Sequence, residues 1–255
     1  MIPSILKDKK TKFNRLWPTI IWLALWQIFA MVLDSEIILA SPIAVIKRLS
    51  QLAITIPFWK SIYFSVIRIT IGFLSAVFFG IFLAILSFKS RIIRLFLEPF
   101  MKTISSIPVA SFIILVLLWV SSSNLNVIIS FLIVLPIIYT NILEGIFETD
   151  YNLVEMATVF RFTKWKKLRY IYFSQVLPFF SSAFKISLGL AWKSGIAAEV
   201  IAIPMGSIGE SLYQSKVYLD TPNLFAWTLS IVLVSMILEK IFLFLLSLVE
   251  RRLEQ

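Results

Sequence analysis

Three ionisable side chains that could do chemistry share one apolar stretch of this chain. Lys185, Lys193 and Glu199 lie within residues 174–201, which otherwise have the composition of a membrane-spanning helix. A charge inside a bilayer costs a few kcal/mol unless it is paired or faces water, so each residue is a functional candidate. At about 100° per residue, Lys185 and Glu199 fall within about 40° of each other, and Lys193 lies about 80° from Lys185. Two interpretations stay open: a polar face that lines a pathway, to which we also assign Trp192, or pairing between helices.

Catalytic chemistry finds little support elsewhere in the sequence. The chain has no cysteine and no histidine, which excludes thiol redox chemistry, disulfides and Cys/His metal sites. It also lacks a G-x-S-x-G turn and a G-x-x-x-x-G-K-[ST] phosphate loop. We therefore predict no catalytic, cofactor-binding or metal-binding residue. If ATP drives this protein, the ATP and its magnesium must be bound by another chain.

Long apolar stretches must position the three ionisable residues. The chain is 59% hydrophobic and 15% charged, with a mean hydropathy of +0.92, which is typical of a helical membrane protein. We predict an all-α fold with about six transmembrane helices: Leu16–Leu33, Ile62–Phe88, Leu95–Val120, Leu125–Phe147, Ser174–Ile201 and Pro222–Leu248.

The distribution of lysine and arginine predicts the orientation. Alternate sides of the six spans carry 15 and 4 of these residues, so both termini are expected in the cytoplasm. The net charge of +10 thus marks the cytoplasmic face and does not indicate nucleic-acid binding. On the outer side, residues 43–56 follow Ser41-Pro42 and are expected to form an interfacial helix, and residues 203–220 a re-entrant turn or a short helix. We predict an N-terminal part, 1–60, and a core, 61–255.

The cytoplasmic segment 152–172 lies between the fourth and fifth predicted spans. Apolar residues recur there at steps of three or four, from Leu153 to Ile171, and five basic residues crowd its second half. This pattern predicts a single amphipathic helix, which would bury its apolar face against a partner.

A motif in that segment resembles the permease subunits of ABC importers, whose cytoplasmic loop carries E-A-A-x-x-x-G, nine residues, and then I-x-L-P. Glu155, Met156 and Ala157 match the first triplet, while Arg161 stands at the glycine position and Ser174 at the proline position. Further matches follow in order over about residues 38–252, and they are similar to the nitrate, sulfonate, taurine, bicarbonate and thiamine-precursor branch. They comprise Ser41-Pro42; Ser65, Arg68 and Gly72; Pro99, Ile107, Pro108 and Ala110; Pro136, Asn141 and Gly145; Leu177-Pro178; Ala191, Trp192, Lys193, Ala198 and Glu199; and Ser207, Ile208 and Gly209.

The resemblance implies a permease of the bacterial inner membrane rather than an enzyme. It would act as a homodimer in the lipid bilayer, with two copies of a separate ATPase subunit and an external solute-binding protein. The substrate would be a small solute, with an anion such as a sulfonate, or a vitamin precursor, as candidates. Two alternatives remain: the membrane component of a vitamin importer with a separate substrate-capture subunit, and a polytopic membrane enzyme.

In such a permease the segment 152–172 would be the coupling helix, which rests on the ATPase. Glycine at position 161 would permit a turn; arginine is expected to remove that freedom and to add a donor fork toward the ATPase or the membrane surface. The predicted ATPase-coupling residues are Glu155, Met156, Ala157, Phe160, Arg161, Thr163 and Trp165.

Overall fold

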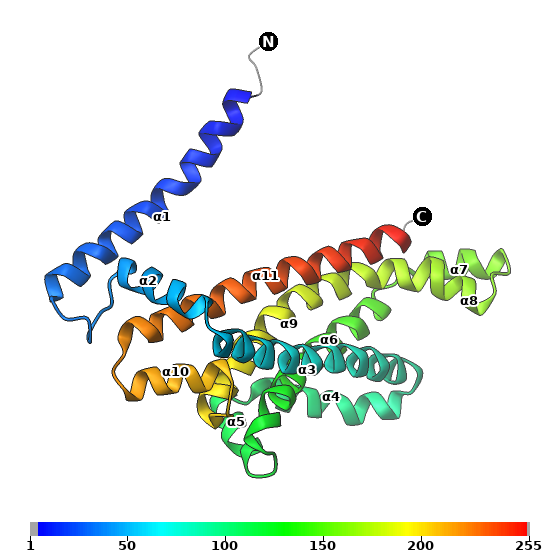
Figure 1. The fold of residues 1–255 in the computed structure, drawn as a ribbon. Helices are drawn as coiled ribbons and strands as arrows, with labels where there is room; N and C mark the ends of the chain where they lie inside the picture. Colours follow the sequence, from blue (N-terminus) through cyan, green and yellow to red (C-terminus); the bar gives the residue numbers. More distant parts are fainter. Residues whose placement is uncertain (1–4, 254–255) are drawn as a thin grey trace. The chain divides into compact units, whose positions relative to one another are not determined.

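The computed structural model describes the backbone of residues 5–253 and the side chains of residues 17–248, and every regular element in that part is helical (Figure 1). The prediction of an all-α protein is confirmed. The basic side chains of the two predicted cytoplasmic tails lie outside the described range. The helices are α1 (Ile5–Leu33), α2 (Pro42–Ala53), α3 (Ile56–Lys89), α4 (Arg91–Ser106), α5 (Val109–Leu117), α6 (Ser122–Phe147), α7 (Tyr151–Val159), α8 (Lys164–Lys167), the π-helical turn η1 (Leu168–Tyr172), α9 (Phe173–Ala202), α10 (Ile208–Val217) and α11 (Thr221–Leu253).

Several of these helices are suited to a bilayer. Among the described residues, α3, α6 and α11 are long and apolar enough to cross a membrane, and α4 with α5 makes a fourth crossing if the bent pair counts as one span. The 30 residues of α9 extend about 45 Å, which exceeds a hydrocarbon core of about 30 Å. The chain is thus membrane-embedded, and the count of six spans stays a prediction.

The third predicted span is not one helix. The axes of α4 and α5 are bent by 105°, and Ile107, at the break, has an extended backbone with ψ 129°. Pro108 explains the break, because its ring disfavours the helical conformation of the residue before it. A single continuous helix over Leu95–Val120 is therefore wrong, and a broken span over this region stays a prediction.

The cytoplasmic segment is also divided. Instead of one helix over 152–172, α7 ends at Val159, a turn follows, and α8 starts at Lys164. The turn η1 then connects α8 to α9 without a break, and the Phe173 N–H donates to the carbonyl of Leu168, five residues back. Such a π turn accommodates one extra residue within a helix.

The described residues form two compact units, one of residues up to 59 with 211–231, and one of residues 60–210 with those from 232 onward. The predicted functional division at residue 60 stays a prediction. In the first unit, Ala40, Val45 and Ala226 form a buried cluster, and Trp26 Nε1 donates to the carbonyl of Ala40 at 3.1 Å. The helix predicted after Ser41-Pro42 is confirmed as α2, which Ser41 Oγ caps by accepting from Ala44 N; its position on the outer side stays a prediction.

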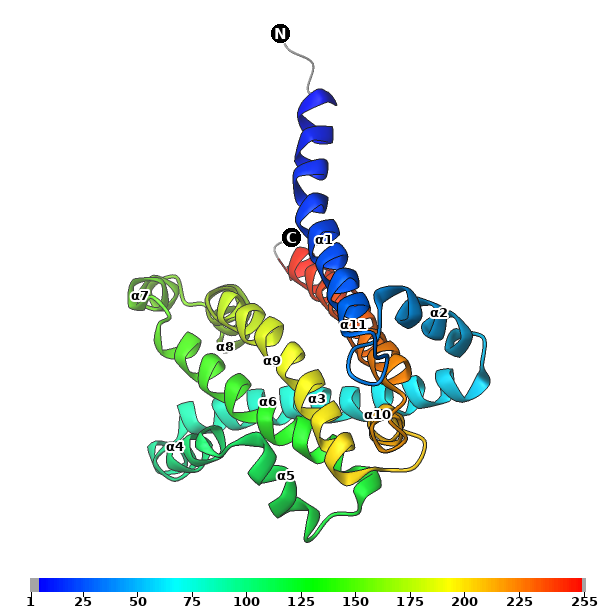
Figure 2. The same cartoon turned by 90° about the vertical axis from the view of Figure 1, so that its left-hand side faces the viewer.

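The second unit is built around α6 and α9, which lie side by side (Figure 2). Residues of α4, α5, α6 and α9 share a buried apolar cluster that includes Ile113, Leu125, Ile129 and Ala198. Small residues of α9 permit close packing: a Cβ on Gly195 would lie 2.6 Å from Cγ1 of Ile69 in α3. This packing sets the positions of the side chains on α9.

Candidate functional site

The short helices α7 and α8 present most of the predicted coupling residues at the surface. The Asp150 carboxylate caps α7 by accepting from Asn152 N at 2.8 Å. Of the seven predicted residues, only Ala157 is buried; Phe160 and Trp165 are 68% and 69% exposed. Met156 and Val159 are exposed nearby, so this segment carries an apolar surface that no described residue covers.

The turn after α7 is a Schellman motif with Arg161 at the position that usually requires glycine. The N–H of Phe162 donates to the carbonyl of Ala157 at 2.8 Å, and that of Arg161 to Thr158 at 3.0 Å. Arg161 has φ +52°, which is the left-handed region. The expectation that arginine removes this turn is therefore wrong: the chain keeps the turn with an unfavourable residue in it.

Two polar contacts fix α8 beyond the turn. Thr163 Oγ1 accepts from Lys166 N and so caps α8, while Lys167 Nζ donates to Thr158 Oγ1 at 2.7 Å. The second contact connects α8 back to α7, and Trp165 is exposed on α8. Thr163 thus shapes the segment through its cap.

The four residues predicted to line a pathway do not share one surface. Lys185 and Lys193 are exposed on α9, whereas Trp192 and Glu199 are buried. Gly189 lies between the two lysines at steps of four, and a Cβ added there would meet nothing within 4 Å. The lysines therefore border an open strip of α9.

The Glu199 carboxylate is fully buried and accepts hydrogen bonds from three other segments. Its Oε2 accepts from Ser65 Oγ at 2.7 Å and from Gly209 N at 3.2 Å, and its Oε1 accepts from Asn126 Nδ2 at 2.7 Å. Ser65 Oγ also accepts from Ile208 N at 3.2 Å. The carboxylate therefore connects α9 with α3, α6 and the start of α10, as the helix-pairing interpretation describes.

Close approach explains the glycine beside this carboxylate. A Cβ on Gly209 would collide with the backbone and Cβ of Glu199. The predicted short helix in the segment 203–220 is confirmed as α10, whose first residues are held against α9 by these bonds.

Sequence reasoning missed Asn126. It is fully buried, and its Oδ1 accepts from Val127 N while its Nδ2 donates to Glu199. An amide in an otherwise apolar run was the available signal, because buried polar groups in membrane helices need partners.

Arg68 makes a second polar connection in this unit. Its Nη1 donates to the Ser123 carbonyl and, at 2.7 Å, to Asn124 Oδ1, and its guanidinium lies 4.4 Å from the centre of the Phe64 ring. The side chain therefore attaches α3 to the start of α6.

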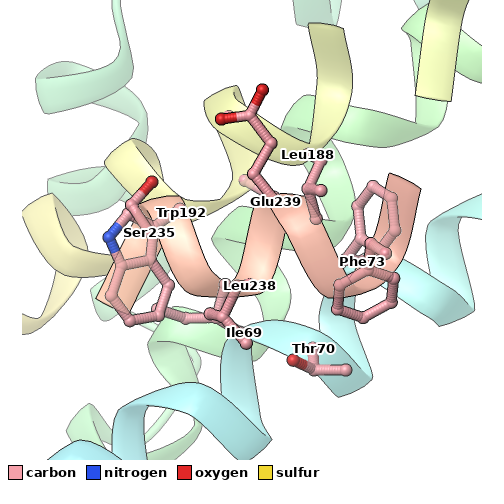
Figure 3. Close-up of a pocket in the computed structure, with 11 residues that line it drawn as sticks. Ile69, Thr70, Phe73, Leu188, Trp192, Ser235, Leu238 and Glu239 are labelled. Carbon is pink, nitrogen blue, oxygen red and sulfur yellow. The ribbon is translucent and has the colours of Figure 1, made fainter. Parts of the chain in front are cut away.

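A small cavity lies among α3, α9 and α11, lined by residues that include Phe73, Leu188, Trp192 and Glu239 (Figure 3). Its volume is about 20 Å³, which is room for about one water molecule. The cavity beside Trp192 is therefore too small for an organic solute in this single chain.

In the first unit, a hollow of about 350 Å³ is lined by polar residues including Arg48, whose Nε donates to Asn223 Oδ1.

Comparison with known proteins gives a consistent result. The family described as "Binding-protein-dependent transport system inner membrane component" matches residues 76–255. A putative aliphatic sulfonates transport permease of Bacillus subtilis is 24% identical over 215 residues, which cover 83% of this chain and 76% of the relative. A probable ABC transporter permease of Brucella melitensis is 25% identical over 230 residues, covering 89% and 91%, and one of Brucella abortus is 25% identical over 230 residues, covering 89% of each.

Proposed function

This chain belongs to the binding-protein-dependent transport system inner membrane component family, and on that premise we propose that it forms the solute pathway of an ATP-driven importer in a bacterial inner membrane. It is a transport permease and not an enzyme, and in ABC systems the ATPase is a separate subunit. The family match favours this role over both the vitamin-importer component and the membrane enzyme.

The uncovered apolar surface of α7 and α8 carries the proposal for the ATPase contact. Met156, Phe160 and Trp165 are exposed, and the two short helices are held together by the contact between Lys167 and Thr158. A helix pair with such a surface fits a groove of a partner protein. Because α6 leads into α7 and α8 runs into α9, movement of an ATPase bound here would pass directly to both helices.

A second copy of the chain completes the proposed pathway. Lys185 and Lys193 are exposed, and a Cβ added at Gly189 between them would meet nothing within 4 Å, so we place this strip at the axis of a homodimer bound to two ATPase copies. Two lysines per copy favour an anionic solute. The name of the Bacillus relative, which concerns aliphatic sulfonates, supports a sulfonate delivered by an external binding protein.

Reversal of one charge tests the ATPase contact. Glu155→Lys should leave the protein in the membrane but abolish ATP-dependent uptake, because it reverses an exposed charge in the middle of α7, where we propose that the partner docks. Uptake and co-purification of the ATPase would be measured in vesicles. Glu36→Lys, the same change at an exposed residue outside this segment, is the matched control. Normal uptake and normal co-purification with Glu155→Lys would refute the assignment.

The lysine strip is tested by uptake of a sulfonate and of a neutral solute of similar size. Lys185→Ala and Lys193→Ala should lower sulfonate uptake at least about tenfold, the equivalent of about 1.4 kcal/mol. Lys240→Ala removes an exposed lysine from α11 and serves as the control. Unchanged sulfonate uptake by both variants would remove the anion proposal while leaving the permease role intact.

A further inference from the structure

The elbow between α3 and α4 concentrates positive charge. Lys89 and Arg91 are exposed on either side of Ser90, and Arg94 follows one turn later. None of the three forms a salt bridge among the described side chains. The first acid of α4, Glu98, already pairs with Lys102 at 3.2 Å. The elbow is therefore an uncompensated basic cluster.

Aromatic contacts hold one of these cations in place. The Arg94 guanidinium lies 4.9 Å from the centre of the Phe147 ring, and Phe88 packs edge-on against that ring at 5.7 Å. Stacking uses the face of a guanidinium and leaves its N–H groups available for hydrogen bonds with a phosphate oxygen. The cluster thus has one donor positioned by aromatic contact, Arg94, beside two exposed ones.

An apolar strip begins next to the basic cluster and runs along α4. Ile92 and Phe96 are 81% and 79% exposed, and Leu95 and Phe100 continue the strip. The core-facing side of the same helix is separate, because Met101 and Ile104 are buried. Helix α4 therefore has apolar residues on two faces, and the described part of the chain covers only one of them.

We propose that the α3–α4 elbow binds an anionic phospholipid. Its phosphate would contact Lys89, Arg91 and Arg94, and one acyl chain would lie along the strip from Ile92 to Phe100. Charge complementarity favours this occupant. A zwitterionic lipid would cover the apolar strip but would not neutralise the excess positive charge, and a soluble anion would neutralise the charge but leave the strip exposed. The predicted cytoplasmic position of the elbow places it at headgroup depth.

Native mass spectrometry of the full chain in detergent tests the site. Phosphatidylglycerol and phosphatidylcholine with identical acyl chains would be titrated separately. We expect preferential binding of phosphatidylglycerol, weakened about fivefold by Arg91→Gln and about 30-fold by Lys89→Gln with Arg91→Gln. Arg91→Lys, which keeps the charge, should bind within about twofold of the unchanged protein. Lys102→Gln, which removes a paired cation from the same helix, should change nothing.

Four results would overturn the proposal. Equal binding of the two lipids would show that only the apolar strip is used. An equal loss with Lys102→Gln would show that net charge matters rather than the elbow. Displacement of the lipid by inorganic phosphate alone would indicate a site for a soluble anion. If a bound ATPase covered the elbow and the two lipids bound equally, the elbow would be a protein interface instead.

Discussion

Replacing Arg161 with glycine should stabilise the turn that ends α7, because the backbone there already has the conformation that glycine favours. A left-handed conformation at φ +52° costs an L-residue about 1–2 kcal/mol relative to glycine. Glycine in turn loses about 0.5–1 kcal/mol more chain entropy when the turn forms. The net gain is about 0.75 kcal/mol, which corresponds to a population of the open turn that is smaller by about 3.5-fold.

Hydrogen exchange at a single amide measures this population. The Phe162 N–H donates to the carbonyl of Ala157 at 2.8 Å only when the turn is closed. We expect its exchange to slow about 3.5-fold in Arg161→Gly. Arg161→Ala removes the same guanidinium but retains the Cβ, and it should show no such slowing.

The two variants also separate the backbone from the side chain. If Arg161→Gly and Arg161→Ala slow the exchange equally, the guanidinium and not the backbone destabilises the turn, and the reasoning fails. If the Arg161 donor fork contacts the ATPase, as predicted from the sequence, both variants lose ATP-dependent uptake to a similar degree, although their turns differ in stability. Normal uptake in both would show that the Arg161 side chain makes no productive contact.

Three further predictions concern the buried carboxylate. Glu199→Ala should lower the free energy of unfolding by about 3 kcal/mol, since it leaves buried donors of Ser65, Asn126 and Gly209 without an acceptor; a loss below about 1 kcal/mol in detergent denaturation would contradict this. Glu199→Gln should lower the free energy of unfolding by less, about 1–2 kcal/mol, because glutamine keeps one acceptor oxygen but places an amide donor opposite another donor. A loss as large as that of Glu199→Ala would be evidence against the hydrogen-bond argument. Gly209→Ala should expose the start of α10 to faster hydrogen exchange, because its Cβ collides with Glu199; unchanged exchange would show that the close approach is absent.

Long apolar runs were sufficient to predict most of the helices. The predicted second, fourth, fifth and sixth spans coincide with α3, α6, α9 and α11, because each run is bounded by polar or charged residues. Pro108 was a signal for the bend, because the residue before a proline disfavours the helical conformation. The apolar residues on both sides of Ile107-Pro108 nevertheless suggested one continuous span. Composition reports which residues prefer a membrane, and it does not report the direction of the helix axis.

The candidate site was less accessible from the sequence. Glu199 was identified because a carboxylate in an apolar stretch needs a partner, but its partners are separated from it by up to 134 positions. The turn at Arg161 was missed because the sequence there contains neither glycine nor proline. The partners of Glu199 are tertiary contacts, and the turn holds Arg161 in a backbone conformation that arginine disfavours. Neither property can be read from the local sequence.

The π turn η1 has a consequence for how the faces of α8 and α9 are aligned. It lies within a continuous helical rod from Lys164 to Ala202 and contains one residue more than an α-helical path requires. Because η1 absorbs this residue, side chains of α8 and α9 are related around the rod as if one residue fewer separated them, a difference of about 100°. The face of α9 that continues a given face of α8 is therefore set by η1, and a single helical count from Trp165 to Lys185 would place the two side chains wrongly by about a quarter of a turn.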